Sequence, residues 1–400
     1  MKNICCFIIV LFSATSFAQR PMDSIMANDI KMLTTIFPGS ENGLSYPTYQ
    51  MEPHDFIYKL DSFRKFAYVS VNNNEFRKKD IDPFARMILS MYKQNYGVDS
   101  TRSAQYYALL SKEENPDSAG QQKLKQLEEE MFTKKLSDAD AKELDSLVFG
   151  NLDLRDSALF VASTAYRQVV SMKLREIQYQ KYADSTREES VSKLHMLDEV
   201  LKDGYVYEYS IHENIDFILN TSKDTALIEQ GYRAYMSRAK NSAFRSSIAT
   251  AYKNYKSLAK NAPAPNFIYR DINGRSVSLK QLKGKYVYID VWATWCGPCK
   301  MQIPYLSKLE EEYKEKNIHF VSLSVDKQKD KAAWEKYVRT NQLKGFQLMA
   351  DKDFQSEFVK KFNITYIPRF ILIDPAGKIV DANALSPSEQ GLRKQFDELL

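Results

Sequence analysis

The strongest constraint on the fold is the alternation of strand and helix patterns after residue 266. A β-branched and aromatic run at 286–292 predicts a buried strand. Helical spacing follows at 297–316, and a second strand is expected at 318–325. Two further helices are expected at 331–340 and 353–362. Strands interleaved with helices predict a three-layer α/β domain with helices on both faces of its sheet.

Two hairpins are expected at the ends of this α/β region. Their strands are predicted at 267–270 with 276–279, and at 369–374 with 378–381. Asn273-Gly274 is a favoured turn pair for the first hairpin. After the second, Ser386 and Glu389 form a capping-box pattern with Pro387 in the first turn. The last helix is therefore expected to begin at Ser386.

Residues 19–260 are predicted to be mainly helical. Apolar residues recur there at spacings of three and four, as on one face of a helix. The pattern occurs at 159–177, 194–201 and 248–255. The highly charged stretch 123–147 indicates an exposed helix. Tyr205, Tyr207 and Tyr209 alternate as in a strand, but the segment is short and its structure stays open.

A change of composition separates the two regions. Residues 261–266 alternate Pro with small residues, and Pro stops a helix and favours extended chain. We therefore expect a linker at 261–266. It would join a mainly α-helical N-terminal domain, residues 19–260, to an α/β domain, residues 267–400.

The first 18 residues have the pattern of a cleavable signal peptide. Lys2 precedes an unbroken apolar and Cys stretch at 4–12, and Ser16-Phe17-Ala18 places small residues at positions −3 and −1 of a cut after Ala18. The alternative is an uncleaved anchor, but the stretch is well short of the roughly 20 residues that a spanning helix needs. We expect an exported, periplasmic protein.

The cysteines indicate redox chemistry. Cys5 and Cys6 lie in the predicted signal peptide, which leaves Cys296 and Cys299, three residues apart. A disulfide across so short a loop restrains almost no chain, so it adds little stability. Half of a zinc site is the alternative, but structural zinc needs four ligands and the chain offers one cysteine pair. We assign no metal-binding or cofactor-binding residues.

The pair follows a predicted strand and opens a predicted helix. Cys296 would lie at the helix N-terminus, where unpaired backbone N–H groups and the helix dipole favour an anion. It is therefore the expected attacking thiolate. Cys299 lies one turn further on and can resolve a mixed disulfide. Gly297 and Pro298 hold both cysteines in the first turn, where a Pro loses no hydrogen bond.

The segment from Asp290 to Lys300, which includes Trp295 and the two cysteines, resembles the active-site segment of thioredoxins. The wider pattern is similar to exported thioredoxin-like disulfide reductases of the TlpA and ResA type. It includes the opening hairpin and a helix-containing insertion at about 326–362. The resemblance covers residues 262–400 and implies a thioredoxin-like three-layer fold.

The resemblance also implies roles for three further residues. Asp290 matches the buried acid of thioredoxins, which takes the proton from the second cysteine, and burial would raise its pKa. Pro304 matches the proline that kinks the active-site helix. Pro368 matches the cis-proline whose loop faces the cysteines and offers backbone groups to an extended substrate. One position departs: ResA-type proteins carry a glutamate where this chain has Gln302, which shifts acid–base duty to Asp290.

We therefore expect a periplasmic disulfide reductase that works through a mixed disulfide. A protein disulfide would be its client, and a membrane thiol protein would supply its electrons. A dithiol oxidase or isomerase stays open, and so does a client-binding helical module with a tethered redox domain. The formal net charge of +5 is small for 400 residues, and no basic run with interleaved aromatics predicts nucleic-acid binding. The sequence does not indicate an oligomeric state.

Overall fold

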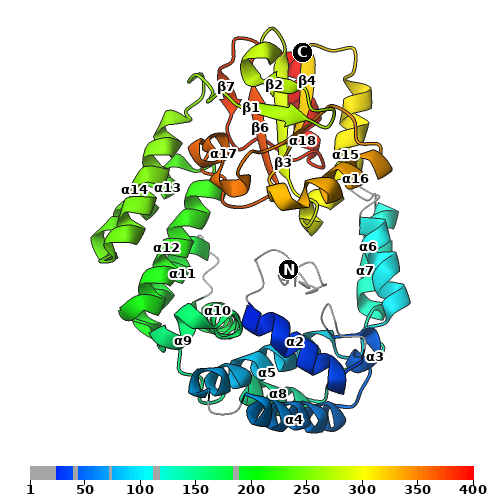
Figure 1. Ribbon diagram of the computed structural model, residues 1–400, viewed down its shortest axis with the longest axis vertical. Helices are drawn as coiled ribbons and strands as arrows, with labels where there is room; N and C mark the ends of the chain where they lie inside the picture. Colours follow the sequence, from blue (N-terminus) through cyan, green and yellow to red (C-terminus); the bar gives the residue numbers. More distant parts are fainter. Residues whose placement is uncertain (1–23, 39–43, 72–73, 111–117, 183–188) are drawn as a thin grey trace. The chain divides into compact units, whose positions relative to one another are not determined.

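The computed structural model describes residues 24–38, 44–71, 74–110, 118–182 and 189–400 (Figure 1). The predicted signal peptide lies outside these residues. By its internal contacts the chain divides into two compact units, Met1–Tyr207 and Glu208–Leu400. Residues 208–260 thus share a unit with the α/β region, and the predicted linker at 261–266 lies inside that unit.

The described part of the first unit is built from helices, as predicted. They are α2 (Ser24–Ile36), α3 (Tyr46–Tyr49), α4 (Pro53–Ser70), α5 (Glu75–Asn95), α6 (Ser100–Leu110), α7 (Ser118–Glu130), α8 (Asp138–Phe149), α9 (Ser157–Ala162), α10 (Thr164–Ile177), a π-helical turn (Gln178–Tyr182), α11 (Glu189–Val200) and the start of α12 (Gly204–Thr221). Aromatic side chains of α4 and α5 are part of the core of this unit. Phe56 and Tyr92 stack there with ring centroids 3.8 Å apart.

Two predictions in this region are corrected, and one segment left open is assigned. The pattern at 159–177 is two helices, because the Ser163 side chain accepts a hydrogen bond from the Tyr166 N–H and caps a new helix there. The charged stretch 123–147 is likewise divided between α7 and α8, and Met131, just after α7, is fully buried. The segment with three alternating tyrosines at 205–209, which the sequence left open, is helical and lies in α12.

The second unit contains one seven-stranded sheet of mixed direction. Its strands are β1 (Ile268–Asp271), β2 (Ser276–Ser278), β3 (Tyr286–Trp292), β4 (Ile318–Ser324), β5 (Phe346–Met349), β6 (Arg369–Ile373) and β7 (Ile379–Asp381), in the order β2-β1-β5-β4-β3-β6-β7. The central strands β3, β4 and β5 run parallel, and β6 runs antiparallel to β3.

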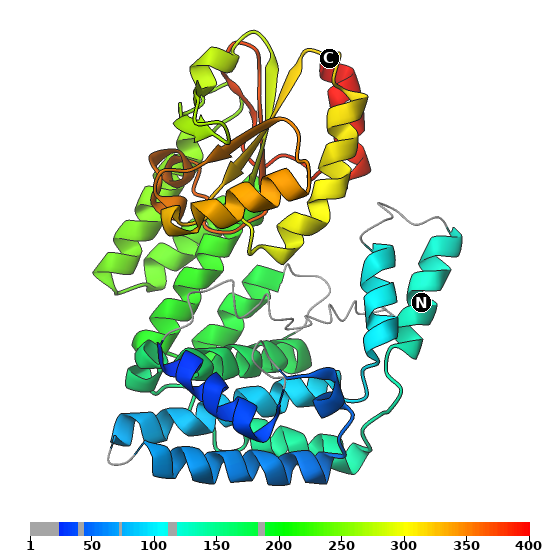
Figure 2. The same cartoon turned by 45° about the vertical axis from the view of Figure 1, so that its right-hand side comes forward.

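Helices cover both faces of this sheet, so the three-layer α/β prediction is confirmed. On one face, α15 (Gly297–Glu312) and α18 (Gln390–Leu399) lie side by side (Figure 2). They share a core with Tyr288 of β3. On the other face, α16 (Lys331–Thr340) and α17 (Glu357–Lys361) share a core with Ile289 and Val291 of β3. Successive side chains of a strand point to opposite faces, so these two residues face away from Tyr288.

Three elements of the second unit differ from expectation. The stretch 353–362 is a 3-10 turn, Asp353–Gln355, followed by the short α17. The last helix begins at Gln390, because residues 386–389 form a separate turn in which the Glu389 side chain accepts from the Ser386 N–H at 2.6 Å. Strand β5 was not expected, although it pairs with both β1 and β4.

Two more helices complete the second unit, α13 (Thr225–Arg238) and α14 (Ser242–Ser257). Helix α14 is tied to the end of α17, because the Asn254 side chain donates to the Asn363 side chain at 3.1 Å. Leu258, just after α14, belongs to the core of the α/β region. Within the described residues, no helix is long and apolar enough to cross a membrane.

Candidate functional site

The cysteine pair lies at the N-terminus of α15, as predicted. Cys296 is the N-cap residue, and its Sγ accepts a hydrogen bond from the Cys299 N–H at 3.1 Å. The two residues form a disulfide with their Cα atoms 5.3 Å apart. Gly297 and Pro298 occupy the first turn between them. A thiolate at Cys296 would thus meet the unpaired N–H groups that begin the helix.

The chain that enters the cysteine pair is held by a buried carboxylate. Asp326 is fully buried after β4. It accepts hydrogen bonds from the Thr294 N–H at 2.9 Å and the Thr294 hydroxyl at 2.7 Å. The Ser324 hydroxyl donates to the same carboxylate at 2.8 Å. No sequence motif marks Asp326, because its partner Thr294 lies 32 positions away.

The loop before β6 faces the disulfide. The Ile367–Pro368 peptide bond is cis, as the resemblance implies. The Ile367 carbonyl oxygen lies 3.9 Å from Sγ of Cys296. This loop therefore presents backbone groups beside the sulfur that a substrate must reach.

Asp290 lies in the middle of β3, paired with Ser322 of β4 and Phe370 of β6. Its side chain is 5% exposed. Burial, with a smaller contribution from the nearby charge of Glu310, raises the pKa of Asp290 to about 8. Asp290 shares its strand face with Tyr288, which packs under α15. The buried acid thus lies beneath the helix that carries Cys299.

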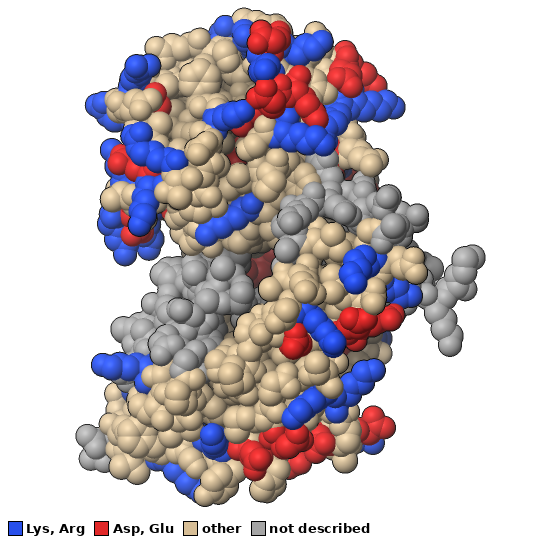
Figure 3. Space-filling model, turned by 90° about the vertical axis from the view of Figure 1, so that its right-hand side faces the viewer, with Lys and Arg blue, Asp and Glu red and all other residues tan. Residues whose placement is uncertain are grey.

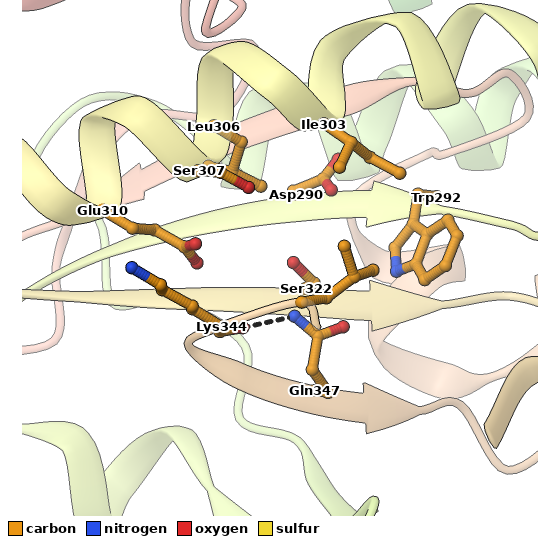
Figure 4. A pocket seen from close by; sticks show the side chains of 10 residues that line it. Asp290, Trp292, Ile303, Leu306, Ser307, Glu310, Ser322, Lys344 and Gln347 are labelled. Atoms are coloured by element: carbon orange, nitrogen blue, oxygen red, sulfur yellow. Dashed lines mark hydrogen bonds between the residues drawn. The ribbon is translucent and has the colours of Figure 1, made fainter. Parts of the chain in front are cut away.

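A small cavity lies between Asp290 and the second buried carboxyl group, that of Glu310 (Figure 4). Its lining residues are Asp290, Trp292, Ile303, Leu306, Ser307, Glu310, Ser322, Leu343, Lys344 and Gln347. Burial raises the pKa of Glu310 to about 7, and the charge of Lys344 opposes this. The buried Gln347 side-chain oxygen has no hydrogen-bond partner. About 10 Å³ is open to the centre of a water molecule, enough for one water among these polar groups.

Two other predicted site residues, Trp295 and Pro304, lie in or next to α15, as does Gln302, the position that departs from the ResA-type pattern. Trp295 is half-buried, with its ring 6.3 Å from that of Phe354. Pro304 lies inside α15, where it removes one helical N–H donor. Gln302, at the position of the expected glutamate, accepts a hydrogen bond from the Ser388 N–H at 3.1 Å. Gln302 thus ties α15 to the loop before α18 and cannot take up a proton.

Comparison with known proteins agrees with this geometry. Residues 259–400 match the Redoxin family. Thiol-disulfide oxidoreductase ResA of Bacillus thuringiensis subsp. konkukian is 36% identical over 117 residues, which are 29% of this chain and 65% of that protein. The chain thus spans a little less than two thirds of that relative.

A second ResA, from Halalkalibacterium halodurans, is 31% identical over 155 residues, which are 38% of this chain and 85% of that protein. The chain belongs to the ResA-type thiol-disulfide oxidoreductase family. The solved thioredoxin domain of a thiol-disulfide oxidoreductase from Bacteroides vulgatus is 31% identical and covers 35% of this chain and 99% of that one, with a TM-score of 0.32. Residues before 259 lie outside the Redoxin match.

The described residues contain no group of three or more His, Cys, Asp or Glu side chains placed to hold a metal ion. The chemistry that the site offers is that of its two sulfurs, one buried acid and one backbone loop. Each of these is contributed by a different part of the α/β fold.

Proposed function

We propose that this protein is a periplasmic thiol–disulfide oxidoreductase that reduces disulfides in protein clients. The observation that carries the proposal is the Cys296–Cys299 disulfide at the N-terminus of α15, faced by the Ile367 carbonyl at 3.9 Å. Reduction of a protein disulfide through a mixed disulfide uses an attacking thiolate, a second thiol that resolves the intermediate and a place for the client backbone. These three requirements meet within this site.

The reaction begins from the reduced pair. The Cys296 thiolate attacks one sulfur of a client disulfide, and the other client sulfur leaves as a thiolate that takes a proton. Cys299 then gives up its proton and attacks Sγ of Cys296. The second client thiolate is released, takes a proton, and the Cys296–Cys299 bond is closed. Two electrons pass from this chain to the client.

Asp290 is the proposed acceptor of the Cys299 proton. A carboxyl group with a pKa of about 8 exchanges protons readily near neutral pH, which suits it to a general base. The cavity towards Glu310 offers room for one water, which would carry the proton onward from Asp290.

The direction and location of the reaction are also proposed. The Gly297-Pro298 pair between the cysteines resembles that of reducing thioredoxins, and the first 18 residues favour export. Recycling would then need a dithiol donor at the membrane. Nucleic acid is not expected as a partner, and on the face drawn in Figure 3 basic and acidic side chains are interspersed.

The reduction potential of the Cys296–Cys299 pair tests the proposal. The protein beginning at Gln19 would be equilibrated in defined thiol–disulfide buffers, alkylated, and its oxidised fraction read by mass. We expect a potential below about −230 mV, as for reducing family members. A value above about −180 mV would instead indicate an oxidase or isomerase. A Cys299→Ser variant, which can form only mixed disulfides, is the control.

A pair that fails to equilibrate with any thiol buffer would exclude the enzymatic functions together. The helical region would then be the main candidate for function, as a module that binds a client.

A further inference from the structure

The loop that carries the cis-proline is tied to helix α12, which lies before the residues that match the Redoxin family. From Glu208 onward, this helix belongs to the same compact unit as the loop. The residues of α12 that bond to the loop, Asp216 and Asn220, lie in its last two turns.

A chain of hydrogen bonds joins α12 to both sides of the cis peptide bond. The Thr365 hydroxyl donates to Oδ2 of Asp216 at 3.0 Å. Nη2 of Arg369 donates to Oδ1 of Asn220 at 2.9 Å. Nδ2 of Asn220 donates to Oδ1 of Asp216 at 3.2 Å, so the two side chains are also bonded to each other. One helix face thus holds the residue three positions before Pro368 and the residue directly after it.

The spacing on α12 explains why two side chains can do this. Asp216 and Asn220 are four residues apart, so they are neighbours on one face of the helix. Arg369 is 7% exposed, and burial lowers its pKa to about 10, so the guanidinium keeps its charge at neutral pH. A buried cation without an acceptor is strongly unfavourable, which makes the Asn220 oxygen important for the position of Arg369.

Asp216 and its neighbour Phe217 make further contacts with the cis-proline loop. Burial raises the pKa of Asp216, while hydrogen bonds from the Thr365 and Tyr366 hydroxyls oppose this rise. The ring of Phe217, the next residue of α12, lies edge-on to that of Tyr366, with centroids 6.5 Å apart. Polar and aromatic contacts therefore fix the same loop against the same helix.

We propose that Asp216 and Asn220 are positioning residues for protein substrates. They hold the loop at 365–369 so that its backbone is already in place for an extended client segment. The inference rests on the proposed thiol–disulfide exchange. A protein disulfide must align its backbone with the loop, whereas a small disulfide needs only to reach Cys296. Loosening the loop should therefore slow exchange with proteins more than exchange with small disulfides.

The test compares two probes, insulin and the small disulfide 5,5′-dithiobis(2-nitrobenzoate). The full mature chain would be reduced, freed of reductant and mixed with each probe, and the second-order rate constants measured. We expect Asn220→Ala to lower the ratio of the insulin rate to the small-disulfide rate by about two- to tenfold, the size of one lost hydrogen bond. A role in stability alone would leave this ratio unchanged.

The matched control is Asn383→Ala. The Asn383 side chain also donates to α12, to the Thr221 carbonyl at 3.3 Å, but it lies outside the cis-proline loop. It should leave the ratio as in the parent protein. An equal fall of the ratio in both variants would overturn the proposal.

A second pair of variants covers the case in which Asn220→Ala fails to fold. Thr365 is exposed, so Thr365→Val removes its hydroxyl with little risk to the core. We expect Thr365→Val to lower the ratio and Thr365→Ser, which keeps the hydroxyl, to restore it. If the parent protein reduces both probes and neither Asn220→Ala nor Thr365→Val changes the ratio, the positioning role is wrong. If the parent protein reduces neither probe, the proposed function fails as well.

Discussion

At the scale of single residues, Asp290 links stability to chemistry. Its folded pKa of about 8 lies above the value near 3.9 expected in an unfolded chain. Stability from its neutral form is therefore full below about pH 4 and is lost as the pH rises towards 8. The site keeps this acid buried although the fold would be more stable with a side chain that does not ionise, because an exposed carboxyl group would be too acidic to accept the Cys299 proton at neutral pH.

Asp290→Asn should therefore have opposite effects on stability and on activity. At pH 7 we expect the free energy of unfolding to rise by a few kcal/mol, since the amide, unlike the carboxyl group, folds without having to bind a proton. The rate of client reduction should fall on the order of 10²-fold, because the amide cannot accept the proton. Urea denaturation at pH 5, 7 and 8.5 and single-turnover reduction of insulin measure the two effects.

The effect of Glu310 on the pKa of Asp290 can be tested separately, with its neighbour Glu311 as the control. Glu310 raises the pKa of Asp290, so Glu310→Gln should shift the pH dependence of the rate to lower pH. Glu311 is exposed and paired with Lys314 and Lys344, so Glu311→Gln should shift the pH dependence less.

For the Asp290→Asn prediction, the contradicting outcome is a measured stability. Equal stability of Asp290→Asn and the parent protein at pH 8.5 would contradict a buried, proton-binding Asp290.

At the scale of elements, long periodic segments were predictable and short irregular ones were not. Strand β3 and helix α16 have the predicted bounds, because each carries an uninterrupted pattern of its period. Strand β5 has four residues and lies between two strands, so its own sequence carries little signal. The cysteine pair was predictable from its spacing and its place between a strand and a helix. Asp326 was missed, because its function depends on a partner brought close only by the sheet.

Gly345, in the loop before β5, shows how one backbone position shapes an element. Its φ is +64°, and a Cβ there would meet the Glu310 carboxylate at 2.7 Å and the Phe320 carbonyl oxygen at 2.8 Å. Gly345→Ala should therefore lower the free energy of unfolding by about 1–3 kcal/mol more than Gly274→Ala. Gly274 has φ +79° with nothing within 4 Å of its added Cβ, so it reports the backbone effect alone. Urea denaturation of both variants measures the difference, and equal losses would contradict the close packing.

At the scale of the whole molecule, the sequence predicted a helical region and an α/β region. It could not show that α12, α13 and α14, the last three helices of the helical region, belong with the α/β fold. The amphipathic pattern of α12 to α14 shows that they have a buried face, not what they pack against. Asp216 and Thr365 meet across 149 positions of chain. The one local signal was Arg369, a charged residue at the start of an otherwise apolar strand, since a buried cation needs a partner from elsewhere in the chain.

This placement predicts a difference between two shortened proteins, residues 208–400 and residues 259–400. The shorter one corresponds to the family match but lacks Asp216, Asn220 and Asn254, and it loses the core contacts of Leu258. We expect its free energy of unfolding to be lower by about 2–5 kcal/mol, the sum of several lost hydrogen bonds and one buried side chain. Urea denaturation of both proteins, at matched pH and with the disulfide intact, measures this.

The same two proteins separate positioning from stability. Both keep Cys296, Cys299 and Asp290, so both should reduce the small disulfide wherever they are folded. The protein that begins at residue 259 should be selectively slow with insulin, because its loop at 365–369 has lost the helix that holds it. Equal denaturation midpoints and equal rate ratios would mean that α12 to α14 only rest against the α/β fold, and that the match at 259–400 is the complete functional unit.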